Sequence, residues 1–169
     1  MFAVKYISIL LILIISVLIG YLLSKKCTNR VRELKDMQNA INILENKITY
    51  TYEPLPEIFL QISDLMKNNI GNIFKETSRR LKKQTIDTAW NDAVANSNTN
   101  LSNEDYEVLK SVSRLLGKTD KDGQVSQLKL SSTFLNAQIR KAEDDENKNS
   151  RMYKTLGTVI GFAIAIVLI

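Results

Sequence analysis

The sequence contains no histidine, a single cysteine, two prolines and six glycines among 169 residues. Without histidine, the chain lacks the most common general base, the usual catalytic triads and the most frequent zinc ligand. The lone Cys27 excludes an internal disulfide, which is typical of a reducing compartment, and it has no histidine partner that would make it a nucleophile. We interpret it as a thiol next to the membrane without a chemical role, and palmitoylation is the alternative. We therefore expect a protein that is not an enzyme and holds no cofactor or metal.

Three short segments imitate functional motifs but fail on spacing. Gly117–Thr119 resembles the end of a phosphate-binding loop, whose first glycine would have to stand at Val112. Asp120–Gly123 resembles the start of a calcium loop, whose glycine would have to stand at Val125. Glu143–Glu146 places four consecutive carboxylates around more than one helix face, so they cannot converge on one ion. We interpret this acidic run as a solvated or ion-paired face.

Apolar residues recur at helical spacing almost throughout, and no window alternates with a period of two. The first helix is predicted to continue to about Tyr50, and Pro54 stands where a second helix begins. Breaks are expected at Asn68–Gly71 and at the polar segment Ala95–Asn103, and a last helix should begin near Asp120–Gln124. The pattern predicts an all-α fold, a compact bundle of about six helices with four short ones between two long terminal ones.

Several residues of the middle segment have predicted local roles. Ser102 should cap a helix, with Asp105 at the third position of a capping box, and Gly117 should end that helix. Phe74 and Trp90 lie on the apolar faces of short helices, so we expect them to anchor the core.

Both ends of the chain are apolar. Phe2–Leu23 contains Lys5 as its only charge, and Thr155–Ile169 is uncharged. The first segment is long enough to span a membrane, whereas the second reaches only about 22 Å and needs Met152 and Tyr153 or a thinned bilayer. A cleaved signal peptide is the alternative for the first segment, but no small-residue cleavage site follows it. The predicted divisions are an N-terminal transmembrane helix at 1–24, a helical domain at 25–153 and a C-terminal transmembrane helix at 154–169.

Charge placement predicts the topology. All lysines and arginines except Lys5 lie between Ser24 and Lys154, so the positive-inside rule places the helical domain in the cytoplasm. The net charge of +5 is spread over a mixed-charge surface without aromatic residues interleaved with arginine. This is an ordinary solvated surface that favours an anionic membrane face, and it is not a nucleic-acid signature.

Small residues recur every four positions on one face of each apolar segment. Gly157 and Gly161 do so in the second, and Ser16 and Gly20 do so in the first. Such faces let helix backbones approach closely, so we predict packing between the two spans or with a partner's span.

A basic run lies near the middle of the chain, with Glu76 as its only acid. It is either a solvated face or a docking patch for lipid headgroups or an acidic partner. Its members are Lys75, Arg79, Arg80, Lys82 and Lys83.

The first and last long helices both meet the membrane at their span ends, so outside it they should run antiparallel with their apolar stripes facing each other. Charge would then select their register. This arrangement brings Arg30, Arg32 and Lys35 opposite Asp144, Asp145 and Glu146.

Over nearly its whole length the chain resembles the stage III sporulation protein AB family of endospore-forming bacteria. The segments that support the resemblance are Leu44–Tyr50 followed by Pro54-Leu55, Ala89-Trp90, Leu116-Gly117 with Asp120 and Gln124, and Arg151–Gly157. Glu53 departs mildly from the family pattern, in which a small or hydroxyl residue precedes the proline.

The resemblance implies a fold similar to the cytoplasmic domain of type II secretion platform proteins. It also implies a place in the mother-cell membrane facing the forespore, in the channel complex that joins the two cells. There the protein would be a non-enzymatic platform that receives a secretion-type ATPase, the companion protein AA. The family supplies no catalytic residues, and no nucleic acid or small-molecule substrate is expected.

A second class of function stays open. The helical domain could be a membrane-tethered sensor or regulator that signals through its spans. A sensor should have a pocket with convergent polar groups, whereas a scaffold should have a filled core and a partner-sized surface.

Overall fold

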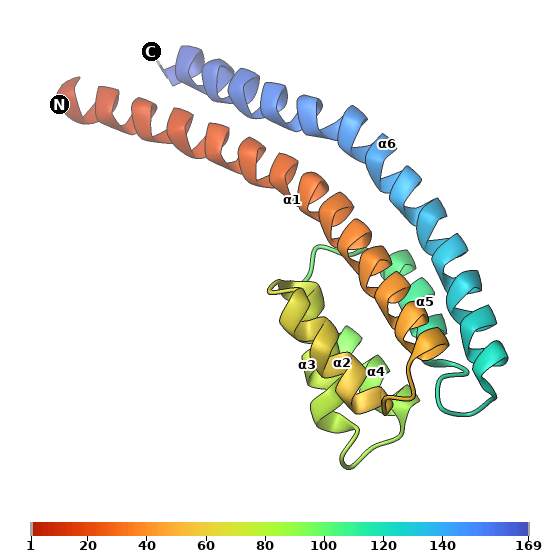
Figure 1. The fold of residues 1–169 in the computed structure, drawn as a ribbon. Helices are drawn as coiled ribbons and strands as arrows, with labels where there is room; N and C mark the ends of the chain where they lie inside the picture. Colours follow the sequence, from red (N-terminus) through yellow and green to blue (C-terminus); the bar gives the residue numbers. More distant parts are fainter. Residues whose placement is uncertain (1, 169) are drawn as a thin grey trace. The chain divides into compact units, whose positions relative to one another are not determined.

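The computed structural model describes residues 2–168, which form six α-helices, one 3-10 helix and no strand. The elements are α1 (Phe2–Tyr50), α2 (Leu55–Leu65), α3 (Asn69–Arg80), α4 (Ile86–Ala95), α5 (Asn103–Lys110), η1 (Ser111–Ser113) and α6 (Lys121–Leu168) (Figure 1). The predicted all-α fold with two long terminal helices is confirmed. The chain divides into two compact units. Residues 32–140 form the first, and from here on the name helical domain refers to this unit and not to the predicted range 25–153. The stretches before and after it form the second unit, which we call the helix pair.

Local sequence explains where the short helices begin. Pro54 precedes α2, where its missing N–H costs no hydrogen bond. The Asn68 side chain accepts a hydrogen bond from the Gly71 N–H at 3.0 Å and caps α3. Ser102 and Asp105 form the predicted capping box, in which each side chain accepts from the other's backbone N–H, at 3.3 and 2.7 Å. These caps satisfy N–H groups that have no partner within the helix.

Two glycines act differently from the prediction. Gly71 does not break a helix, because it lies buried inside α3, where a Cβ atom would fall 1.6 Å from the Met66 carbonyl oxygen. The break is made by Asn68, and the glycine permits close approach of the preceding turn. Gly117 has a φ of +67°, the left-handed conformation that favours glycine, but α5 has already ended at Lys110. Gly117 therefore ends the turn after η1 and not the α-helix itself.

Three aromatic rings from three helices fill the core of the helical domain. Phe59 of α2, Phe74 of α3 and Trp90 of α4 are fully buried. The Trp90 ring centroid lies 5.2 Å from that of Phe74, edge to face, and 6.1 Å from that of Phe59. Trp90 Nε1–H donates to the Leu109 carbonyl oxygen at 2.7 Å, which ties α4 to α5. The prediction that Phe74 and Trp90 anchor this core is confirmed.

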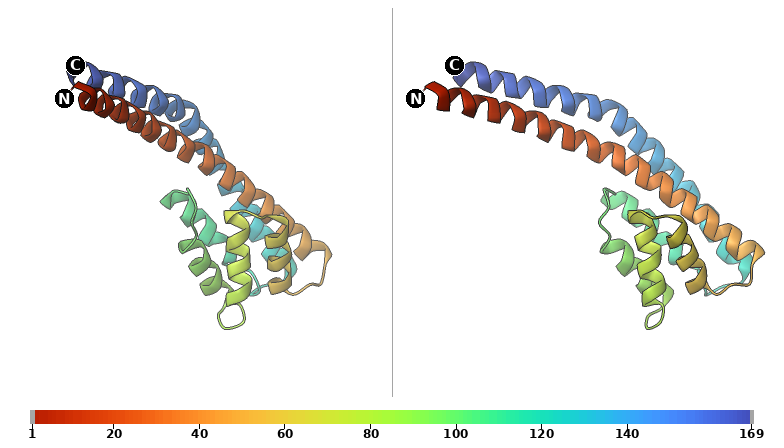
Figure 2. Two further views of the ribbon diagram at one scale, coloured as in Figure 1. Left: turned by 90° about the vertical axis from the view of Figure 1, so that its left-hand side faces the viewer. Right: turned by 60° about the vertical axis from the view of Figure 1, so that its left-hand side comes forward.

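Within the helical domain, the later part of α1 and the earlier part of α6 lie side by side (Figures 1 and 2). Their buried stripes are Leu34, Ile41 and Leu44 on α1 and Leu128, Leu135 and Ile139 on α6. Gln38 Nε2 donates to Ser132 Oγ at 3.0 Å across the contact. Ile48 and Val125 continue these two apolar stripes, but they are only half-buried because they lie near the end of α1 and the start of α6.

Candidate functional site

In the helix pair, the earlier part of α1 and the later part of α6 are joined by polar contacts that fix an antiparallel register. The bonded pairs are Arg30 with Asp145 (3.0 Å), Thr28 with Glu146 (2.7 Å), Ser24 with Ser150 (2.6 Å) and Ser16 with Gly157 (2.7 Å). Residue numbers fall along α1 as they rise along α6. The predicted pairing of basic and acidic runs is thus found for Arg30 and Asp145.

These charges also act on the cysteine. Burial raises the pKa of the Cys27 thiol above its ordinary range, and the nearby carboxylates of Asp145 and Glu146 raise it further. Arg30 opposes this shift. Since the thiolate is the reactive form, Cys27 is held in its less reactive state.

The four small residues predicted to pack lie together at one close helix crossing. A Cβ atom on Gly20 would fall 2.6 Å from the Tyr153 carbonyl oxygen and 3.1 Å from the Gly157 Cα. A Cβ on Gly157 would fall 2.9 Å from the Ser16 carbonyl oxygen. The Ser16 hydroxyl also donates a hydrogen bond to the Gly157 carbonyl oxygen. Gly161 is less confined, since its Cβ would meet the Ser16 Cβ at 3.3 Å. The crossing therefore requires glycine most strictly at Gly20 and Gly157.

The outer surface of the helix pair is apolar. Large side chains of α1 such as Ile7, Leu11, Leu18 and Leu22 are exposed. Among the described residues, one helix contains a segment, from Leu10 on, that is long and apolar enough to cross a membrane, and little of that segment is buried. An apolar surface of this extent marks contact with lipid or protein. Membrane association follows for the N-terminal helix, and a second span from residue 154 stays a prediction.

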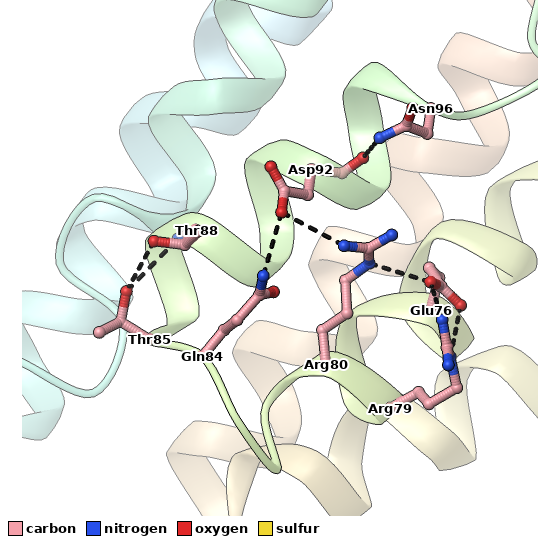
Figure 3. A network of polar contacts seen from close by, with 8 residues as sticks. All are labelled: Glu76, Arg79, Arg80, Gln84, Thr85, Thr88, Asp92 and Asn96. Carbon is pink, nitrogen blue, oxygen red and sulfur yellow. Dashed lines mark hydrogen bonds and ion pairs between the residues drawn. The ribbon is translucent and has the colours of Figure 1, made fainter.

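The basic run of the helical domain is partly engaged within the domain (Figure 3). Arg79 donates from Nε and Nη2 to the two carboxylate oxygens of Glu76, at 2.9 and 2.6 Å. Arg80 bridges Glu76 at 2.9 Å and Asp92 at 3.2 Å. The hydrogen bond from Arg79 is the largest cause of a lowered pKa at Glu76, so this carboxylate stays ionised. Lys75, together with Lys82 and Lys83, is exposed.

The acidic run Glu143–Glu146 is divided in its contacts. Asp145 and Glu146 are engaged by α1 as described above. Within residues 2–168, no group of three or more metal-binding side chains converges on one point.

Sequence reasoning missed one buried acid. Glu33 is 4% exposed and its carboxylate accepts from the Asn100 backbone N–H at 2.6 Å, the Asn100 side chain at 3.1 Å and the Asn69 side chain at 3.2 Å. It thereby ties α1 to the start of α3 and to the loop before α5. The sequence contained one signal for this burial. Glu33 lies one turn before the buried Met37, on the apolar face of α1, and a polar residue on such a face needs hydrogen-bond partners.

These features define a membrane-associated, all-helical protein with a filled domain core and polar surface clusters. A family model, Stage III sporulation protein AB, matches residues 5–169. The chain belongs to this family, and the resemblance seen in the sequence is confirmed.

Two relatives show how far the similarity extends. The chain is 29% identical over 168 residues to the stage III sporulation protein AB of Bacillus subtilis (strain 168), covering 97% of this chain and 98% of that protein. A solved structure described as stage III sporulation protein AB is 27% identical, with a TM-score of 0.67, and the match covers 71% of this chain and 98% of that one.

Proposed function

We propose that this sporulation protein is a non-enzymatic membrane platform in the channel complex that joins mother cell and forespore. In this role its helical domain lies in the cytoplasm of the mother cell and receives a secretion-type ATPase, the companion protein AA. The main observation in support is family membership over almost the whole chain, combined with an apolar helix that can hold the domain at a membrane.

The interior of the helical domain favours a scaffold over a sensor. A sensor needs an enclosed cavity with convergent polar groups. Here the centre of the domain is occupied by the rings of Phe59, Phe74 and Trp90, packed 5.2 to 6.1 Å apart. The domain also has hollows on its surface, two of which are lined mainly by polar and charged residues.

The basic run is the surface most suited to receive a partner with acidic side chains. Its exposed lysines, Lys75, Lys82 and Lys83, present a concentrated positive charge. Such a patch speeds encounter with an acidic surface and selects against basic ones. The small-residue crossing would meanwhile hold the helix pair together within the bilayer. In lipid the hydrophobic effect does not drive helices together, so their association depends on the van der Waals contacts that close backbone approach allows.

Co-purification from sporulating cells tests the proposal. The full chain with a C-terminal affinity tag is isolated from detergent-solubilised membranes, with the ATPase gene present or deleted. The matched control is residues 1–24 fused to an unrelated soluble domain with the same tag. We expect the ATPase to elute with the full chain and not with the control. Equal recovery of the ATPase from both would contradict the platform role.

A further inference from the structure

A surface hollow of about 450 Å³ lies between α3 and the end of α4. Its charged lining includes three cations, Lys75, Arg79 and Arg80, against the single carboxylate of Glu76. Its neutral lining includes the amides of Asn72, Asn96 and Asn98. The hollow therefore has an excess of positive charge and a rim of groups that form hydrogen bonds.

The contacts in Figure 3 distinguish a cation that is held by two carboxylates from one that is exposed to solvent. Arg80 is held on two sides, by Glu76 and by Asp92, and its side chain is 26% exposed. Arg79 is 71% exposed, and its guanidinium keeps further N–H groups beyond the two that bond Glu76. Lys75 lies four residues before Arg79, on the same face of α3. Arg80 is thus part of the wall of the hollow, while Lys75 and Arg79 are its exposed cations.

The amides at the rim indicate which anion fits. A phosphate headgroup offers only acceptors, but asparagine side chains both donate and accept, as peptide backbone groups do. Asn96 is fixed in place because its Nδ2 donates to the Asp92 carbonyl oxygen at 2.7 Å. The last turn of α4 is capped from within, because Asn96 and Ser97 donate to the Asp92 and Val94 carbonyl oxygens, and the Asn96 side chain keeps its amide oxygen as an acceptor for a peptide N–H.

We propose that this hollow binds an acidic, extended segment of a partner protein. Lys75 and Arg79 pair with its carboxylates, and Asn72, Asn96 and Asn98 bond its backbone. The inference rests on the proposed platform function for the choice of a protein partner at this surface.

Binding of a labelled peptide tests the site directly. The probe is a fluorescent octapeptide of alternating glutamate and glycine, titrated with the full chain in nanodiscs of zwitterionic phosphatidylcholine. The control probe has glutamine in place of glutamate. We expect the double variant Lys75→Gln, Arg79→Gln to bind the acidic probe about fivefold or more weakly, since two ion pairs are lost. The single variant Lys75→Gln keeps the Arg79–Glu76 contact and should lose about twofold.

The chain offers a charge-matched control in the double variant Arg114→Gln, Lys121→Gln. It also removes one arginine and one lysine, both exposed, both outside the basic run and neither of them lining the hollow. We expect its affinity to stay within about twofold of the wild type. Equal losses in the two double variants would overturn the site, because they would indicate attraction by net charge alone. So would Lys75- and Arg79-dependent binding to phosphatidylglycerol vesicles without binding of the peptide, which indicates a lipid site.

Failure of this inference is distinguishable from failure of the platform role. If the ATPase co-purifies equally with the Lys75→Gln, Arg79→Gln variant and the wild type, the hollow is not its docking site and the inference is overturned, while the platform role stands. If the peptide binds selectively but the ATPase does not co-purify, the site is supported and the proposed partner is wrong.

Discussion

Truncation of Trp90 measures how much of the domain's stability depends on the aromatic core. The indole is fully buried, contacts two other rings and makes one buried hydrogen bond. Trp90→Ala removes the ring contacts and leaves a cavity, which typically costs roughly 3–5 kcal/mol. Domains of this kind have free energies of unfolding of about 5–15 kcal/mol, so about a fifth of the stability or more would be lost.

A second substitution separates the hydrogen bond from the packing. Trp90→Phe keeps an aromatic ring beside Phe59 and Phe74 but removes the donor to the Leu109 carbonyl oxygen. The loss of that bond costs about 0.5–1.5 kcal/mol, and the smaller ring adds a similar amount. We therefore expect Trp90→Phe to destabilise the domain by about 1–3 kcal/mol, and in a side-by-side measurement to destabilise it less than Trp90→Ala.

The assay is urea denaturation of the full chain in detergent, followed by far-ultraviolet circular dichroism. Tyr52→Ala is the matched control, because this aromatic side chain is fully exposed and its removal should change the free energy of unfolding by less than about 0.5 kcal/mol. If Trp90→Ala unfolded at the same urea concentration as Tyr52→Ala, the packing described for α2, α3 and α4 would be refuted.

Three further predictions concern the helix pair and its topology. Gly157→Ala should weaken cross-linking between α1 and α6 in the membrane, because it places a Cβ atom under 3.0 Å from a backbone atom of the other helix. Gly161→Ala does not, so it should leave cross-linking near the wild-type level. Equal effects of the two substitutions would contradict the close crossing. Cys27 should react slowly with a maleimide at pH 7.5, and Asp145→Asn should speed the reaction about two- to threefold, because removal of a raising charge lowers the thiol pKa and increases the thiolate fraction; an unchanged rate would show that the carboxylate has no such effect. In a chain without Cys27, a cysteine placed at Asn98 should resist an impermeant thiol reagent in intact cells and react after lysis, and labelling before lysis would reverse the topology.

The predictable part of this fold is its local part. Apolar spacing, Pro54 and the Ser102–Asp105 capping box locate the helices because each signal acts within one or two turns. Gly71 was misassigned because its role depends on the Met66 carbonyl, which approaches only when α2 and α3 pack. Tertiary contacts of this kind leave little trace in the local pattern.

The candidate site divides in the same way. The small-residue faces follow from spacing alone, and so do the bonds from Glu76 to Arg79 and Arg80, three and four residues further on. The bond from Arg80 to Asp92 does not, since it requires the particular approach of α3 to α4. The hollow beside them arises from that same approach, so its lining could not be read from the basic run.

The pairing of α1 with α6 has a consequence for biosynthesis. Gln38 and Ser132, which are hydrogen-bonded in the folded domain, are separated by 94 residues in the chain. At ribosomal rates of about 5–20 residues per second, the buried stripe of α1 waits roughly 5–20 seconds for its partner helix. Throughout that interval Leu34, Ile41 and Leu44 have no α6 to cover them, and the short helices must assemble on an incomplete surface. Loop closure over such a distance makes docking of α6 a late step of folding, so a ribosome stalled before α6 would leave a nascent chain prone to aggregation at the membrane.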